Sequence, residues 1–250
     1  MQLSKIAIVA DTHAPFQDSR AIALACELIA DFAPDEVVHL ADGVDFYAVS
    51  SFDRDPERVT RLQEELDAAI MVNKIIASSA KSAEHYYLES GNHEARWIRY
   101  LHKHPEISGL DALRFDSLLK LSETGWELGG EDREYCAGRL VLTHGKRVSK
   151  HAGTSARFAL ENEMHQRSVI IGHSHRQGVV MESGPRLMVG GWEVGCLCEL
   201  EPEYVRHPNW QQGIAFVTTG SGHSFGVELI TFVGNGRVRR AIWRGKEYTA

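Results

Sequence analysis

Five short polar segments, each directly after a hydrophobic run, constrain this chain more than any other feature. The runs read as buried strands and are KIAIVA, EVVHLA, HYYLES, RLVL and SVII. The segments that follow them are Asp11-Thr12-His13, Asp42-Gly43-Val44-Asp45, Gly91-Asn92-His93-Glu94, Thr143-His144-Gly145 and Gly172-His173-Ser174-His175. Carboxylate and imidazole groups are common ligands of divalent metals. Their convergence from several strand ends predicts a hydrolytic site with two metal ions.

The first half of the chain alternates strands and helices. Residues 5–10 form a near-continuous apolar run, residues 19–32 carry apolar residues at helical spacing, and residues 36–41 form a second strand. Residues 56–82 read as a long helix with Pro56 in its first turn, and residues 94–121 as helical with a break at Pro105. This alternation predicts parallel βαβ units.

The second half is richer in strands. Short runs at GVVME, RLMVG, GIAFVTT, VELITFV and RVRRAIW are separated by Gly, Pro and Asn, which favours antiparallel pairing. The chain shows no linker or repeat, so we expect a single domain over residues 1–250 with a helical insertion at about residues 55–121. The long helix carries a wide apolar stripe that includes Leu66, Ile70 and Ile75. A second copy of the chain would cover it, which predicts a homodimer.

In their order, the five segments resemble the signature of the calcineurin-like metallophosphoesterases: D-x-H, G-D-x-x-D, G-N-H-[DE], H and G-H-x-H. The match runs from Asp11 to His175, roughly two-thirds of the chain. The resemblance implies an α/β fold, a four-layer αββα sandwich of two mixed sheets flanked by helices. Ala41 departs from the Gly usual before the second motif. Phe46 stands where the protein-phosphatase branch has a phosphate-holding Arg, which weighs against a phosphoprotein phosphatase.

The resemblance also implies a ligand set for two divalent cations. The first cation would be held by Asp11, His13, Asp42 and His175. The second would be held by Asp42, Asn92, His144 and His173. Asp42 is then the bridging carboxylate. Because no Cys belongs to this set, the set favours Mn²⁺, Fe, Zn²⁺ or Ni²⁺ over softer metals, and of these we expect Mn²⁺.

The resemblance gives further residues catalytic roles. A hydroxide held between the cations would attack phosphorus, and His93 would be the general acid that protonates the leaving oxygen. Asp45 would orient His93 and raise its pKa. Glu94 is expected to cap the helix that follows it.

Candidate substrate-binding residues lie near the motifs. Arg96, whose guanidinium suits phosphate oxygens, is the strongest, and Lys146 and His151 follow a ligand loop. Trp210 could stack on a base or sugar. The segments THGKRVSKHAG and EYVRHPNWQQG resemble phage-type members of the family, which by association favours a nucleic acid or nucleotide as substrate. We therefore expect a phosphodiesterase. A phosphomonoesterase and a non-catalytic metal-binding scaffold are the alternatives.

Composition narrows the setting of this chemistry. The net charge of −7 over 250 residues argues against a protein that coats duplex DNA. No apolar run reaches the ~20 residues that a membrane helix needs, and the N-terminus lacks a secretory signal pattern. The four cysteines fit free thiols in a reducing compartment. These features predict a cytoplasmic protein with no membrane partner.

Overall fold

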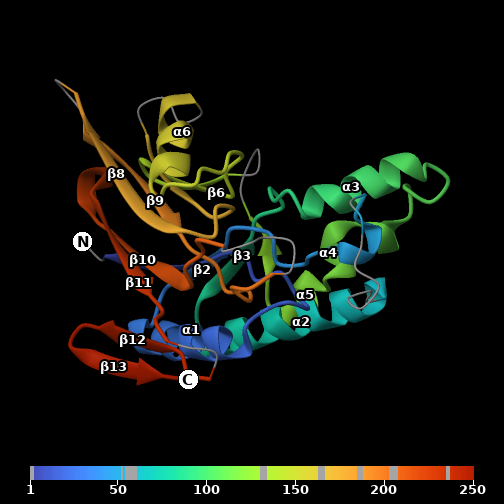
Figure 1. Ribbon diagram of the computed structural model, residues 1–250, viewed down its shortest axis with the longest axis horizontal. Helices are drawn as coiled ribbons and strands as arrows, with labels where there is room; N and C mark the ends of the chain where they lie inside the picture. Colours follow the sequence, from blue (N-terminus) through green and yellow to red (C-terminus); the bar gives the residue numbers. More distant parts are fainter. Residues whose placement is uncertain are drawn as a thin grey trace.

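Two β-sheets face each other, and helices cover the outer face of each (Figure 1). The computed structural model describes residues 3–51, 53, 61–129, 134–162, 167–184, 188–202, 208–234 and 237–250. The first sheet has the order β11 (Phe225–Thr231), β10 (Gly213–Thr219), β1 (Ser4–Val9), β2 (Glu36–His39), β3 (Glu84–Tyr87) and β4 (Glu127–Leu128). The second has the order β5 (Tyr135–Ala137), β6 (Leu140–Thr143), β7 (Ser168–Ile171), β9 (Met188–Val194) and β8 (Gln177–Ser183).

Both sheets are mixed. Strands β1 to β4 run parallel, whereas β10 pairs antiparallel with both β1 and β11. In the second sheet β6, β7 and β9 run parallel, and β5 and β8 are antiparallel edge strands. The predicted antiparallel pairs in the second half are therefore present, one pair in each sheet. A final hairpin of β12 (Arg240–Trp243) and β13 (Lys246–Thr249) packs beside α1 (Ser19–Phe32).

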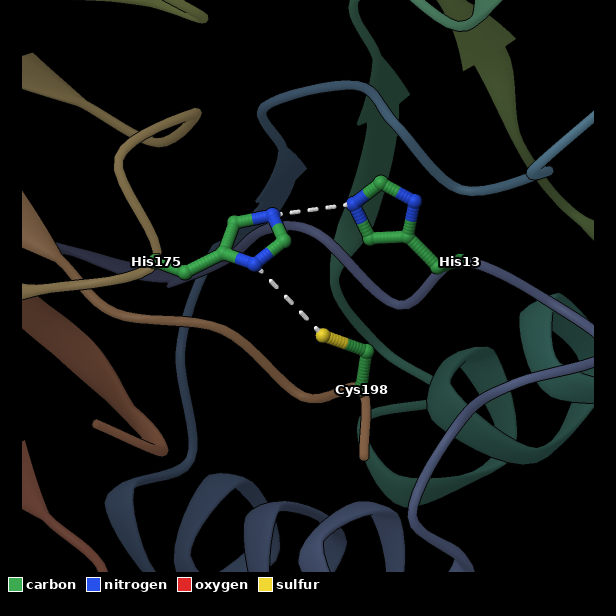
Figure 2. A group of neighbouring side chains, drawn as sticks. All are labelled: His13, His175 and Cys198. Carbon is green, nitrogen blue, oxygen red and sulfur yellow. Dashed lines mark hydrogen bonds between the residues drawn. The ribbon is translucent and has the colours of Figure 1, made fainter. Parts of the chain in front are cut away.

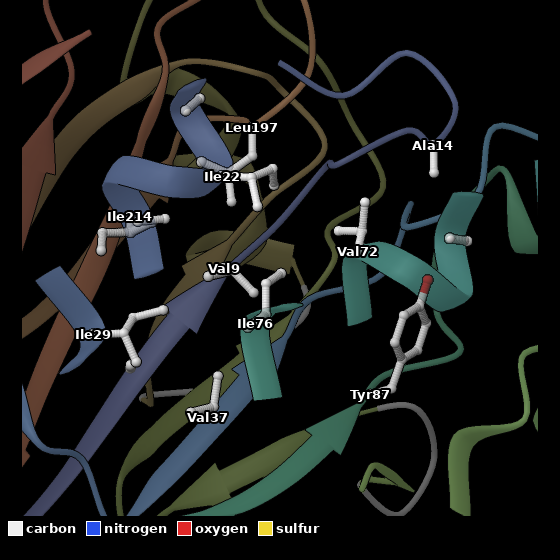
Figure 3. Packing of buried hydrophobic residues seen from close by; sticks show 14 of the residues in the cluster. Val9, Ala14, Ile22, Ile29, Val37, Val72, Ile76, Tyr87, Leu197 and Ile214 are labelled. Carbon is white, nitrogen blue, oxygen red and sulfur yellow. The ribbon is translucent and has the colours of Figure 1, made fainter. Parts of the chain in front are cut away.

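Three apolar clusters define four layers. Alternate residues of a strand point to opposite faces, so Ile6 and Ile8 pack between the two sheets while Val9 faces the helices. Figure 3 shows the helix side of the first sheet, where Val9 and Val37 pack with Ile29 and Ile76. The third cluster lies between α6 (Thr154–Asn162) and the outer face of the second sheet. The predicted αββα sandwich is confirmed.

Helix α1 begins where its sequence provides a cap. The side chain of Asp18 accepts hydrogen bonds from the backbone N–H groups of Arg20 and Ala21, which have no partner within the helix. The helix ends at Ala33, which adopts the left-handed conformation with φ of 49°. Its apolar stripe is buried against the first sheet and α2 (Leu62–Ser79).

The helix predicted over residues 56–82 is α2, which begins at Leu62; residues 56–60 lie outside the described part of the chain. Leu66, Ile70 and Ile76 are buried, and α2 packs on α1 and α5, whereas Met71 and Ile75 are 64% and 40% exposed. The chain itself therefore covers most of this stripe. Covering this stripe therefore does not require a second copy of the chain.

The segment predicted as helical over residues 94–121 consists of several pieces. They are α3 (Glu94–Lys103), the 3-10 turn η3 (Asp111–Leu113), α4 (Phe115–Leu118) and α5 (Leu121–Thr124). Helix α3 ends two residues before Pro105, as the break predicted. Another 3-10 turn, η1 (Tyr47–Val49), follows Phe46. Within the described ranges, no helix has both the length and the apolar character needed to cross a membrane.

Candidate metal centre

The parallel strands bring the five polar segments to one end of the sandwich. Strands β1, β2 and β3 end just before Asp11, Asp42 and Asn92, and in the facing sheet β6 and β7 end just before His144 and the His173–His175 loop. Carboxyl ends of parallel strands meet at the same edge of a sheet, which is a common place for ligand sites. All seven side chains predicted as metal ligands lie in this region.

One group of potential ligand atoms surrounds Asp11. Its Oδ1 lies 3.3 Å from Nε2 of His175 and 3.7 Å from Nε2 of His13. The two Nε2 atoms are themselves 3.0 Å apart. Oδ2 of Asp42 lies 3.9 Å from the same nitrogen of His13. These four side chains are the predicted first set.

A second group shares Asp42. Its Oδ2 lies 3.1 Å from Nε2 of His144. That nitrogen is 3.3 Å from Oδ1 of Asn92 and 3.2 Å from Nδ1 of His173. The Asp42 carboxylate therefore stands between the two groups, where a bridging ligand would have to be.

The backbone around these ligands is held in an uncommon conformation. Five of the seven have positive φ angles between 48° and 64°, and they are Asp11, His13, Asp42, His173 and His175. Residues other than glycine adopt this left-handed region at an energetic cost, and such strain concentrates at functional sites. Ala41, which the sequence showed in place of the usual Gly, also has a φ of 75°. A glycine would relieve that strain, which explains the usual preference.

The donor atoms fit a pair of cations. Among the described residues, Oδ1 of Asp11 is buried and accepts no hydrogen bond, a costly state for a carboxylate oxygen. Two pairs of imidazole nitrogens face each other at 3.0 and 3.2 Å, and each pair can share only one proton. A cation beside each group would satisfy these lone pairs. Oxygen and nitrogen donors suit Mn²⁺, Fe, Zn²⁺ or Ni²⁺.

Charge in the pocket also favours cations. Burial alone raises the pKa of the Asp11 and Asp42 carboxyls, but the surrounding histidines outweigh it and lower both pKa values. Burial alone lowers the pKa of His144, yet Asp42 outweighs it and raises this pKa to about 9. Two buried, ionised carboxylates are unfavourable unless positive charge lies beside them, and either protons or metal ions can supply that charge.

Asp45 is shared by three side chains. Its Oδ2 lies 3.3 Å from Nδ1 of His13 and 3.4 Å from Nδ1 of His93, and its Oδ1 accepts from Nη1 of Arg96 at 2.9 Å. The contact with His93 was predicted, whereas the contacts with His13 and Arg96 were not. Asp45 thus orients a candidate ligand as well as the candidate acid.

The geometry around His93 fixes its tautomer. Nδ1 donates to the backbone carbonyl of Asp45 at 2.8 Å, and Nε2 faces Nη2 of Arg96 at 3.3 Å. A guanidinium can only donate, so Nε2 must accept. As expected, Asp45 raises the pKa of His93, but burial outweighs both Asp42 and Asp45, so this pKa is lowered to about 4.

The remaining predicted substrate residues lie at different places. The Trp210 ring is half-buried and meets the His175 ring edge-on, with centroids 4.3 Å apart. Lys146 and His151 are exposed on the loop between β6 and α6. Arg96 and Trp210 therefore contact the predicted site, and Lys146 and His151 lie on the loop that leaves it. Phe46, in the position of the phosphatase arginine, is buried and stacks on Trp97.

Three buried glutamates hold the loops of the site, and sequence reasoning missed this role. Glu94 does not cap α3; its carboxylate accepts from the backbone N–H of Asp42 and Gly43. Glu65 accepts from the backbone N–H groups of residues 47 and 48, just after Asp45. Glu193 accepts from those of residues 155 and 156 and from the hydroxyl of Ser174. Only Glu94 had a local signal, its place in the G-N-H-[DE] motif.

Replacing Glu94 with glutamine should lower the free energy of unfolding of the metal-free protein. The carboxylate accepts three hydrogen bonds, two from backbone N–H groups and one from the hydroxyl of Tyr87 at 2.7 Å. An amide NH₂ would leave at least one buried donor without a partner, at a cost of about 1–3 kcal/mol. Urea unfolding in the presence of a chelator measures this change. Glu127→Gln on exposed β4 is the control, and equal unfolding free energies for both variants would refute the role.

Comparisons with known proteins identify a family and several proteins that this chain resembles. The family model described as calcineurin-like phosphoesterase matches residues 4–189. The chain is 28% identical over 242 residues to the Gene 54 protein of Mycobacterium phage D29, covering 92% of this chain and 94% of that protein. It is also 28% identical over 254 residues to the Gene 54 protein of Mycobacterium phage L5, with 92% and 94% covered. The phosphoesterase YfcE from E. coli aligns with a TM-score of 0.41 at 14% identity, covering 90% of this chain and 98% of that one.

The match to the family model spans well over half of the chain. The chain therefore belongs to the calcineurin-like phosphoesterases, a family that acts on phosphoester bonds. The family and the clustered ligand atoms together indicate a centre for two divalent metal ions.

Proposed function

We propose that this protein hydrolyses phosphodiester bonds of a nucleic acid or nucleotide, with Mn²⁺ as its preferred metal. The observation that carries the proposal is the convergence of seven candidate ligands on the buried carboxylate of Asp42, with His93 and Arg96 beside it. When bound, two divalent cations supply an activated water and neutralise phosphate oxygens.

His93 is the general acid of this proposal. Its Nε2 lies 4.0 Å from Oδ2 of Asp42, close to where a bound phosphate would meet the centre. In this structure Nη2 of Arg96 donates a hydrogen bond to that nitrogen. A phosphate oxygen that replaces Nε2 as the acceptor of the Nη2 hydrogen bond, while Asp45 still holds Nη1, leaves Nε2 beside an anion, and a neighbouring negative charge favours the protonated imidazole. Protonation of His93 is thereby linked to substrate binding, and the proton is then given to the leaving oxygen.

Three observations support a nucleotide diester over a monoester. A diester carries one negative charge, whereas a monoester dianion carries two. Within the described part of the chain, Arg96 is the guanidinium that contacts Asp45 and His93, and Phe46 stands where the protein-phosphatase branch has a phosphate-holding arginine. Trp210, beside His175, offers an aromatic face for the base or sugar of a nucleotide. The two phage relatives fit a nucleic-acid setting by association.

One substrate screen distinguishes a phosphodiesterase from a phosphomonoesterase and from a non-catalytic scaffold. Protein loaded with Mn²⁺ is assayed on bis-p-nitrophenyl phosphate, p-nitrophenyl phosphate, a cyclic nucleotide and single-stranded DNA, and the assay is repeated with Zn²⁺, Ni²⁺ and Fe²⁺. We expect the diester substrates to have the higher kcat/KM. A higher value for the monoester would support the phosphomonoesterase alternative. A metal-loaded protein inactive on every ester would support the scaffold.

Arg96→Ala should lower kcat/KM about tenfold to a hundredfold. The guanidinium is half-buried and held by Asp45, so it is positioned before phosphate arrives, and a hydrogen bond to a charged group contributes about 1.5–3 kcal/mol. Steady-state kinetics on a diester measure the change. Arg99→Ala, one helical turn away on the exposed face of α3, is the matched control. Unchanged KM and kcat in Arg96→Ala would remove Arg96 from the proposed site.

A further inference from the structure

Histidine ligands of metals normally present one ring nitrogen to the metal and donate the other N–H to an acceptor. In this chain Nδ1 of His13 faces the carboxylate of Asp45 at 3.3 Å, and Nδ1 of His144 faces the carbonyl of Leu40 at 2.8 Å. Nδ1 of His175 differs, because it faces Sγ of Cys198 at 3.8 Å (Figure 2). The sulfur and the His13 ring lie on opposite edges of the His175 ring.

We propose that Cys198 is a positioning residue for His175. Its sulfur accepts the N–H of Nδ1, which leaves the lone pair of Nε2 directed at the candidate ligand group of Asp11 and His13. In the opposite arrangement the thiol would donate to Nδ1, and Nε2 would carry a hydrogen that blocks metal binding. This inference rests on the proposed role of His175 as a ligand.

The main chain around Cys198 is built to hold the sulfur in place. The N–H of Leu197 donates to the carbonyl of Asp11 at 3.1 Å, and the carbonyl of Leu197 accepts from the N–H of Asp18 at 2.9 Å. The carbonyl of Cys198 accepts from Nε2 of Gln212 at 2.8 Å. The residue is 3% exposed. The segment that carries Cys198 is thus hydrogen-bonded directly to the loop that carries Asp11.

A sulfur partner has a chemical consequence. A thiol is a weaker hydrogen-bond acceptor than a carboxylate and brings no negative charge to a pocket with two buried carboxylates. It can therefore fix the tautomer and ring orientation of His175 without adding further charge. Loss of such a partner typically lowers metal affinity about 10- to 100-fold.

The test compares Cys198→Ala and Cys198→Ser with Cys26→Ala. Cys26 is a partly buried cysteine of α1 whose sulfur contacts the carbonyl of Ile75 at 3.8 Å, so its removal is the matched control. Calorimetric titration with Mn²⁺ should show about 10- to 100-fold weaker binding at one of two sites in Cys198→Ala. Cys198→Ser should recover part of the affinity, and Cys26→Ala should bind as the parent does. Thermal unfolding with chelator confirms that each variant is folded.

Two spectroscopic measurements separate positioning from other roles. Imidazole ¹⁵N NMR of the metal-free parent should show His175 with hydrogen on Nδ1, and Cys198→Ala should show a mixture of tautomers. Equal Mn²⁺ affinity in the parent and Cys198→Ala would overturn the inference and leave the metal centre intact. A sulfur-to-cobalt charge-transfer band in the Co²⁺-loaded parent would also overturn it, because Cys198 would then be a ligand. A parent that binds no metal would instead refute the proposed function.

Discussion

Replacing Asp42 with asparagine should abolish phosphoesterase activity and remove the stabilisation that divalent cations give the protein. Asp42 stands between both candidate ligand groups, 3.1 Å from His144 and 3.9 Å from His13. An amide has one oxygen and no negative charge, so it cannot bridge two cations. A ligand that binds only the folded state stabilises it by about 2.7 kcal/mol at 100 times its Kd, and this increment should be lost.

Differential scanning calorimetry with and without Mn²⁺ measures that increment, and metal analysis counts the bound ions. Asp67→Asn on the exposed side of α2 is a suitable control, because the Asp67 carboxylate accepts from Nε2 of Gln63 on the same helix at 2.9 Å and belongs to neither candidate ligand group. The control should keep activity and the full Mn²⁺-dependent rise in Tm. If Asp42→Asn retained two tightly bound metal ions, Asp42 would not be the bridging ligand.

Replacing His93 with alanine should lower turnover while both metal ions stay bound. General-acid catalysis contributes roughly 10²–10⁴-fold for poor leaving groups. The loss should shrink for p-nitrophenolate, which departs without a proton. Kinetics on a series of aryl and alkyl diesters give the dependence on leaving-group pKa, which should steepen in the variant.

His102→Ala is the matched control for His93, since His102 lies exposed in the last turn of α3, the helix that His93 directly precedes. It should leave the dependence on leaving group unchanged. If His93→Ala lost the same factor in turnover for good and poor leaving groups, His93 would transfer no proton. Its role would then be to bind phosphate or to stabilise the structure of the site. Metal analysis of the same samples separates either result from simple loss of the centre.

The candidate ligand set was readable from the sequence because its signals are local. Each ligand follows a strand by one to a few residues, and parallel strands must bring their carboxyl ends together. The αββα layers were expected from the family resemblance, and the apolar run over residues 5–10 fits them, because such a run is apolar on both faces only when both faces are covered. Helix α3 likewise ends near Pro105 for a local steric reason.

The partners of those ligands were not readable, because they come from distant parts of the chain. Asp45 seemed to serve His93 alone, yet it also holds His13 and Arg96. Glu94 looked like a helix cap and instead binds the backbone of residues 42 and 43, about fifty positions earlier. The pKa of His93 depended on burial, which no spacing of residues reveals.

By itself, then, the sequence determined that polar candidate ligands follow the strand ends and that strands and helices alternate in the first half, since both follow from short-range patterns of polarity. Only the tertiary structure decided which buried groups support that chemistry. Glu65 reaches the loop after Asp45 from α2, and Cys198 reaches His175 from a segment that is hydrogen-bonded to the Asp11 loop. The physical reason is that irregular loops expose backbone and imidazole N–H groups that must find acceptors. The acceptor that is used depends on which distant segment packs there.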